Sequence, residues 1–201
     1  MKKTSLHAFA IAITLLIGAG SIHAGVSDYI SNLDYGVKAN VSLSQLSNQN
    51  KAKNQTGFGI EGIASYQYTD NFSIETGLGI DMRGYAVDIK DTKATKTNYI
   101  QVPVSARYQF PQQVWNANIS AIGGGYASYL LSADNDGKDV KSSYENIDYG
   151  VRFGVAANIQ QFNVEVAYDL GLSKVASVTD TNSKTVDGKN RSIRIAGSYQ
   201  F

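Results

Sequence analysis

Apolar and polar residues alternate along most of the chain, and this two-residue period constrains the fold more than any other feature. In LDYGVKANVSL (33–43), the odd-numbered residues are aliphatic or aromatic and the even-numbered residues are small or polar. Successive side chains of a β-strand point to opposite faces, so this period predicts a strand with one apolar face. The same pattern predicts eight strands, at residues 33–43, 56–68, 72–86, 98–110, 115–131, 145–159, 162–175 and 191–201.

Short and long connections alternate between these segments. The tight connections are 69–71, 111–114 and 160–161. The long ones, which are rich in Lys, Asp, Asn, Ser and Thr, are 44–55, 87–97, 132–144 and 176–190. Outer-membrane barrels of bacteria have short periplasmic turns and longer extracellular loops. The sequence therefore predicts an all-β fold, an eight-stranded antiparallel up-and-down transmembrane β-barrel with both termini in the periplasm.

The first 24 residues have a different character. A positive start (MKK) precedes an apolar run (AFAIAITLLIGAG) and a stretch that ends on the small residue Ala24. This arrangement predicts a secretory signal peptide at 1–24, followed by the barrel domain at 25–201. An uncut membrane anchor is the alternative, but the apolar run is short for a span. Cleavage would remove both histidines, His7 and His23, from a chain that also lacks Cys.

The polar face of the strands identifies the inside of the predicted barrel. It consists of small residues with single charges between Gly and Ser, which suits a narrow lumen better than a solvated exterior. An eight-stranded barrel has an interior that side chains just fill, so opposite charges there can pair. A soluble lipocalin-like ligand-binding barrel is the alternative, and it would bury the apolar face instead. The predicted lumen charge network is Lys38, Glu61, Glu75, Asp81, Arg83, Arg107, Asp148, Arg152, Glu165, Asp169 and Arg194.

Aromatic residues gather beside the short connections, as expected of rings at a membrane interface. The predicted periplasmic aromatic girdle is Tyr66, Tyr68, Phe72, Tyr108, Phe110, Trp115, Phe162, Tyr199 and Phe201. The chain ends on Phe201, with apolar residues at alternate preceding positions. This ending resembles the C-terminal signal of bacterial outer-membrane proteins, which implies insertion by the outer-membrane barrel assembly machinery. A closed barrel would also pair this last strand with the first.

One strand carries a more specific pattern. In TNYIQVPVSARYQF (97–110), Tyr99, Pro103, Arg107 and Tyr108 resemble the Tyr, apolar-Pro-apolar and basic-Tyr positions of the PorT-like outer-membrane β-barrel domain family. The resemblance continues through AIGGGYASYLLSA (121–133), IDYGVRFGVAANI and VEVAYDLGLSKV. It implies a small OmpA/OmpX-type barrel and transfers no catalytic residue.

Enzymatic chemistry finds little support in the sequence. Outer-membrane hydrolases resemble one another in using a His whose pKa lies near neutral, and the chain after residue 24 has none. The lumen carboxylates could serve a glycosidase, but they also balance the lumen bases, so we interpret them as a charge network. DNDG (134–137) lacks the Glu that ends a calcium loop and is interpreted as a turn. We therefore expect no enzyme, no metal and no cofactor.

The predicted function is a non-enzymatic outer-membrane scaffold whose extracellular loops serve envelope integrity or surface interaction such as adhesion. A narrow channel for small solutes is the alternative, and it needs a continuous water path through the lumen. The expected partners are outer-membrane lipid and lipopolysaccharide, with a possible extracellular ligand at the loops. Basic loop residues suited to phosphate or glycan contacts are Lys51, Lys53, Lys90, Lys93 and Lys96. The net charge of +1 gives no reason to expect nucleic acid.

Overall fold

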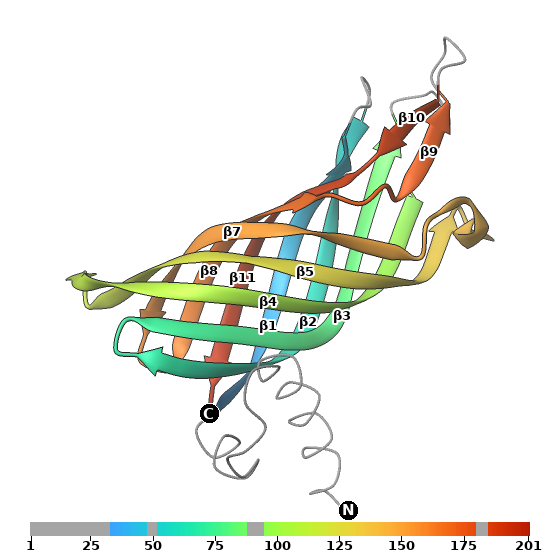
Figure 1. Cartoon of the computed structure of the whole chain (residues 1–201). Helices are drawn as coiled ribbons and strands as arrows, with labels where there is room; N and C mark the ends of the chain where they lie inside the picture. The colour runs from blue at the N-terminus through green and yellow to red at the C-terminus, as the bar shows by residue number, and fades with distance from the viewer. Residues whose placement is uncertain (1–32, 48–51, 88–94, 180–184) are drawn as a thin grey trace, which may run out of the picture.

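The chain forms a closed antiparallel β-barrel in the computed structural model, which describes residues 33–47, 52–87, 95–179 and 185–201 (Figure 1). The barrel strands are β1 (Leu33–Leu46), β2 (Ala52–Thr69), β3 (Phe72–Val87), β4 (Thr95–Val114), β5 (Ala117–Asn135), β7 (Ile147–Ile159), β8 (Phe162–Gly171) and β11 (Asn190–Gln200). Each pairs with the next, and β11 pairs with β1 from Gly36↔Gln200 to Leu46↔Asn190. The predicted eight-stranded up-and-down barrel is confirmed. The predicted signal peptide, 1–24, lies outside the described residues.

The start of β1 and the C-terminal Phe201 lie together at the end of the barrel that carries the short turns. The amide of Phe201 donates a hydrogen bond of 2.9 Å to the carbonyl of Tyr35, directly beyond the β1–β11 ladder. The terminal strand is therefore fully paired, and the barrel has no free edge along β1. We call this end the short-turn end and the opposite one the long-loop end.

The β4–β5 turn lies elsewhere than predicted. The sequence interpretation placed a tight connection at 111–114. Instead, β4 runs on to Val114, and the two-residue turn is Trp115–Asn116, with φ of 50° and 61°. Two consecutive positive φ values are typical of a type I′ hairpin turn. Pro111 lies in a bulge between the pairs Gln109↔Ser120 and Gln113↔Asn118 and has no register partner on β5.

Most strands also run further toward the long-loop end than predicted. Strands β2 and β4 have 18 and 20 residues, whereas about 9–11 suffice to cross a bilayer. The predicted loop 132–144 contains the end of β5, β6 (Lys138–Asp139) and the 3-10 turn η1 (Lys141–Ser143). The predicted loop 176–190 contains a hairpin of β9 (Ala176–Thr179) and β10 (Thr185–Gly188), which projects from the barrel in Figure 1.

The DNDG segment forms a tight turn between β5 and β6. Asp136 and Gly137 have φ of 54° and 76°, and they separate the pairs Asn135↔Lys138 and Asp134↔Asp139. The carboxylate of Asp134 accepts a hydrogen bond of 3.0 Å from the amide of Gly137. The carboxylate thus serves the turn itself, in agreement with the interpretation as a turn.

Pro103 lies in the middle of β4, a position that proline normally avoids. The β3–β4 ladder has bridges at Gln101 and Val104, but none at Pro103, which stands opposite Gly77. The hydroxyl of Thr76 donates to the carbonyl of Pro103 at 2.8 Å, so this group remains hydrogen-bonded. Two successive missing bridges, at Val102 and Pro103, accommodate the proline in a strand that is otherwise paired.

The two faces of the barrel wall differ as the alternation predicts. Large apolar residues such as Ile60, Phe153 and Ile195 are exposed on the outside, whereas the buried set inside is mostly polar or charged. The core of this protein is therefore its lumen. None of the helices in the described ranges is long and apolar enough to span a membrane.

Candidate functional site: the barrel lumen and its two ends

The charged residues of the lumen form two clusters, and the first lies toward the short-turn end. We call it the Lys38 cluster, and it contains Lys38, Glu61, Glu75, Arg107 and Glu165. The Lys38 ammonium donates to Glu75 and, at 3.1 Å, to Glu165. Arg107 contacts the same two carboxylates at 3.2 and 2.6 Å, whereas Glu61 lies 4.0 Å from Lys38. Two cations thus face three carboxylates.

The second cluster contains three Arg and three Asp residues and lies toward the long-loop end. We call it the Arg194 cluster, and its members are Asp81, Arg83, Asp148, Arg152, Asp169 and Arg194. Arg194 donates to both oxygens of Asp81 at 2.9 and 3.0 Å, and to Asp169 at 3.1 Å. Arg152 forms a two-pronged pair with Asp169 at 2.6 and 2.9 Å. These fork geometries fix side-chain orientation as well as charge.

Arg83 is held by more groups than any other cation of the Arg194 cluster. Its guanidinium contacts Asp81 at 2.5 Å and Asp148 at 2.6 Å, and it also donates to Gln101. Its Cζ atom lies 5.1 Å from the ring centre of Tyr99 and 5.0 Å from that of Tyr126. Cation–π contacts of this kind are strongest where water is excluded. Arg83 therefore lies between carboxylates and two aromatic rings in the interior of the barrel.

All eleven residues predicted for the lumen charge network are buried within the barrel. A buried charge is costly unless it is paired and hydrogen-bonded. Five of the six carboxylates accept a hydrogen bond from a buried cation; Glu61 has the 4.0 Å contact with Lys38. Ion pairs between strands that are far apart in the sequence, such as Asp81 on β3 and Arg194 on β11, connect the walls of the barrel through its interior.

Near the long-loop end, an apolar segment covers the Arg194 cluster. Val140 and Tyr144, which flank η1, pack against Tyr99 and Leu130 of the lumen. Tyr144 also packs against Leu46 and Val175 from the opposite side of the barrel mouth. The segment is fixed by backbone hydrogen bonds, including one of 2.9 Å from Val140 to Ala133. We call these two residues and their contacts the apolar cap.

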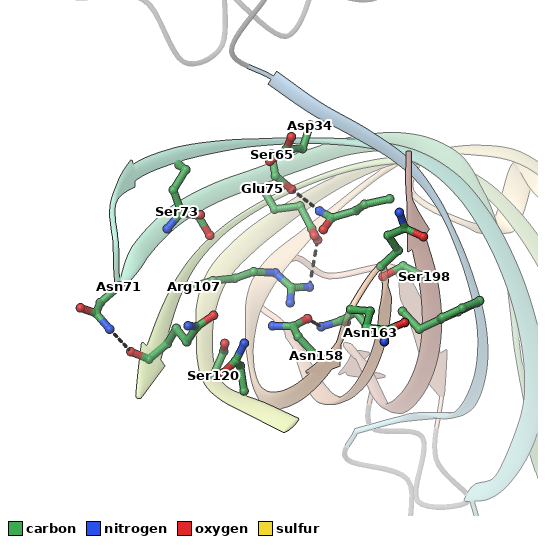
Figure 2. A pocket seen from close by; sticks show the side chains of 17 residues that line it. Asp34, Ser65, Asn71, Ser73, Glu75, Arg107, Ser120, Asn158, Asn163 and Ser198 are labelled. Atoms are coloured by element: carbon green, nitrogen blue, oxygen red, sulfur yellow. Dashed lines mark hydrogen bonds and ion pairs between the residues drawn. The ribbon is translucent and has the colours of Figure 1, made fainter. Parts of the chain in front are cut away.

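The short-turn end, in contrast, is hollow. A cavity of about 200 Å³ opens there, and the Glu75–Arg107 pair forms part of its lining (Figure 2). Of its 17 lining residues, nine are Asn or Gln and four are Ser. They come from the ends of strands and from turns that are far apart in the sequence, such as Asn71, Asn118 and Gln160. Barrel closure brings them into one ring.

The nine residues predicted for the girdle are half-buried or exposed, and they lie near the short-turn end. Several of their rings contact one another: Phe162 and Tyr199 at 5.2 Å between ring centres, and Tyr199 and Phe201 at 5.8 Å. Tyr108 and Phe110 are 5.7 Å apart in an edge-to-face arrangement. Trp115 stands apart, since it is 96% exposed at the tip of the β4–β5 hairpin.

The arrangement offers little to catalysis. Each carboxylate that could serve as an acid or base in sugar hydrolysis, apart from Glu61, is engaged by Arg or Lys. Within the described ranges, no group of three or more His, Cys, Asp or Glu residues could hold a metal ion. Of the basic loop residues named above, Lys96 is exposed on β4, whereas Lys51, Lys90 and Lys93 lie outside the described residues.

Sequence reasoning missed several polar residues that complete the lumen. Asp148 also accepts hydrogen bonds from Ser173 at 2.6 Å and from Asn190 at 2.9 Å, and both donors lie in segments interpreted as strand end or loop. Tyr126 was not singled out, although it shares its strand face with Ser128, which faces the lumen. The ring of Asn and Gln around the cavity was also missed, because each of these residues taken alone is typical of a turn.

An apolar exterior around an ion-paired interior defines this molecule as an integral β-barrel of a membrane. Residues 23–177 match the model of the outer membrane protein beta-barrel domain, so the chain belongs to this family and is located in a bacterial outer membrane. Its fold is similar to that of neisserial surface protein A (NspA), with a TM-score of 0.52, 17% identity, and coverage of 83% of this chain and 97% of that one.

A second similar structure is OprG from Pseudomonas aeruginosa, with a TM-score of 0.50 and 13% identity. The match covers 84% of this chain and 94% of OprG. At these identities the likeness concerns the fold alone. No curated protein matches the sequence.

Proposed function

We propose that the protein is a non-enzymatic, non-conducting scaffold of the outer membrane that presents its long-loop end at the cell surface. It serves envelope integrity or surface interaction such as adhesion. The observation that carries this proposal is the filled lumen, in which Arg83 and Arg194 pair with Asp148 and Asp81 on strands that are not their neighbours, beneath the apolar cap. The orientation follows the family rule that short turns face the periplasm.

A narrow channel is the second candidate, because the cavity at the short-turn end could serve as its vestibule. Recordings in planar bilayers separate the two. We expect the purified wild-type barrel to be silent, because an ion would have to part buried Arg–Asp pairs. The charge-balanced double variant Arg83→Ser/Asp148→Ser, which removes a pair in contact at 2.6 Å, is the positive control for an opened lumen. Steady single-channel steps from the wild type would support the channel instead.

The two scaffold roles, surface interaction and envelope integrity, can be distinguished by removing part of the long-loop end. A variant in which a two-residue turn replaces the β9–β10 hairpin leaves the eight barrel strands in place. If the protein binds a partner at the surface, cells that carry this variant attach to host matrix less than wild-type cells. If it serves envelope integrity, attachment is unchanged, and only deletion of the whole barrel sensitises cells to detergent.

The PorT-like relationship within the family is part of this proposal. Tyr99, Pro103, Arg107 and Tyr108 lie on one strand, with the first three facing the lumen and Tyr108 facing outward. The expected partners also belong here. They are lipid and lipopolysaccharide around the apolar exterior, and the barrel assembly machinery at the C-terminal strand. Turnover of lipid or glycan by the purified barrel, lost on replacement of Glu61 or Glu165, would contradict the non-enzymatic role.

A further inference from the structure

The cavity at the short-turn end has an unusual lining for a protein interior. Nine carboxamide and four hydroxyl side chains surround a volume of about 200 Å³, and Phe162 is the only apolar residue among those that line it. Figure 2 shows these side chains converging from several strands. A carboxamide offers both donors and acceptors, so this ring can bind groups of either kind.

The two charged residues of the cavity interior, Glu75 and Arg107, are paired within the protein. Glu75 pairs with Lys38 and Arg107, so neither it nor Arg107 offers an unpaired charge to a ligand. The remaining acidic residue of the lining, Asp34, is exposed at the rim. The interior of the cavity therefore favours an uncharged molecule over a cation or an anion.

At least one carboxamide is not satisfied by the fold. Asn163 is 6% exposed and donates from Nδ2 to Asn158, but its Oδ1 has no hydrogen-bond partner in the part of the chain that the structure describes. The Nε of Arg107, another lining residue, is also buried without a partner among the described residues. A buried polar atom without a partner costs free energy, which a ligand donor or acceptor would recover.

We propose that this cavity binds a small uncharged molecule rich in hydroxyl or amide groups, and that its natural class is a single sugar ring. The neighbouring hydroxyl groups of a sugar match the paired donor and acceptor of a carboxamide. The cavity volume of about 200 Å³ is smaller than the roughly 300–1,000 Å³ of sites for larger ligands, which suits a single ring. In the proposed orientation the sugar enters from the periplasm. The inference goes beyond the scaffold role, because binding there needs neither the surface loops nor conduction.

A titration with N-acetylglucosamine tests the proposal on the full barrel in nanodiscs of phosphatidylcholine, a lipid without sugar. The readout is the side-chain amide signals of Asn and Gln in ¹⁵N NMR spectra. We expect saturable shifts in a few of these signals. Glucosamine and glucuronate, which carry a positive and a negative charge, should bind more weakly, because the interior offers no unpaired charge to either.

Asn163→Leu is the decisive variant, and Asn40→Leu is its matched control. Asn40 is also 6% exposed, also has an unpartnered Oδ1, and also faces the lumen, but it does not line the cavity. We expect Asn163→Leu to weaken binding about five- to tenfold, the worth of one neutral hydrogen bond, and Asn40→Leu to leave it unchanged. Heat-dependent mobility on gels verifies that both variants fold.

A second variant and its control, each of which removes only one hydroxyl group, replace the first two if Asn163→Leu does not fold. Ser198→Ala removes a hydroxyl from the lining, and Ser192→Ala removes one from the same strand outside it. Only the first should weaken binding. No saturable shift with the neutral sugar would overturn the proposal, as would tighter binding of glucosamine or equal effects of a variant and its control. None of these results bears on conductance or attachment, so the scaffold role would stand or fall separately.

Discussion

Replacement of Arg194 by Met tests whether the ion pairs of the lumen stabilise the barrel. Arg194 is among the largest fully buried side chains, and it contacts two oxygens of Asp81 at 2.9 and 3.0 Å and Asp169 at 3.1 Å. Removing one partner of a buried pair costs about 3–5 kcal/mol, because the other charge stays buried. Here Asp81 keeps Arg83, and Asp169 keeps Arg152. We therefore expect Arg194→Met to lower the free energy of unfolding by about 3 kcal/mol, the lower end of that range.

The matched control for this variant is Arg191→Met, on the same strand. Arg191 is exposed, whereas Arg194 faces the lumen. We expect the control to change the free energy of unfolding by less than about 0.5 kcal/mol. Both values come from urea titrations of the barrel in lipid vesicles, in which the folded fraction is read from the heat-dependent gel mobility. Equal losses in the two variants would refute the stabilising role of the Arg194 cluster.

A double variant separates pairing from packing. Asp81→Asn weakens the same contacts from the other side, so the two substitutions should not be additive. We expect the loss in Arg194→Met/Asp81→Asn to fall short of the sum of the single losses by about 0.5–3 kcal/mol, as for residues in one ion-pair network. Strict additivity would mean that Arg194 stabilises the barrel through its bulk and not through its charge.

Three further substitutions test the barrel wall and its assembly. Gly124→Ala should lower the free energy of unfolding by about 1–3 kcal/mol, because the new Cβ would clash with the backbone oxygen of Val104 on β4. Gly123→Ala is the control: its Cβ would have no atom within 4 Å, and we expect a change under about 0.5 kcal/mol. Ile195→Arg should lower the free energy of unfolding in lipid by about 2–4 kcal/mol, because Ile195 lies on the outer face and the substitution turns a charge toward the bilayer. Phe201→Ser should lower insertion in cells but not refolding in vitro, because the ring is exposed.

The strand count and the inside–outside assignment could be predicted because they depend on a local signal. Each strand must turn apolar side chains to lipid and small or charged ones to the lumen, so its sequence alone reveals both faces. The alternation of Ile193, Arg194 and Ile195 is an example. A shift of one residue would place Arg194 in lipid, which makes the assignment of the two faces unambiguous.

Strand ends and charge partners could not be predicted, for different reasons. Beyond the membrane both faces of a strand meet water, so the apolar period is lost while pairing continues, as at the start of β2. The turn predicted at 111–114 lies instead at Trp115–Asn116, and an irregularity of the ladder contains Pro111. Which charges meet depends on how the closed barrel staggers its strands, and the pairing of Arg83 on β3 with Asp148 on β7 follows from that stagger alone.

The two ends of the lumen are built for different tasks. Toward the long-loop end, Arg–Asp forks lie beneath the apolar cap, and planar guanidinium groups hold such geometry more rigidly than an ammonium does. Toward the short-turn end, the ammonium of Lys38 contacts Glu75 and Glu165, and beyond the Lys38 cluster lies the cavity lined mostly by Asn, Gln and Ser. A molecule in this cavity contacts the paired charges of the Lys38 cluster. To pass on toward the long-loop end, it would have to separate the buried ion pairs of Arg83 and Arg194. The cavity at the short-turn end and the surface at the long-loop end are therefore separated by the buried ion pairs, and the binding proposed for the first does not depend on the presentation proposed for the second.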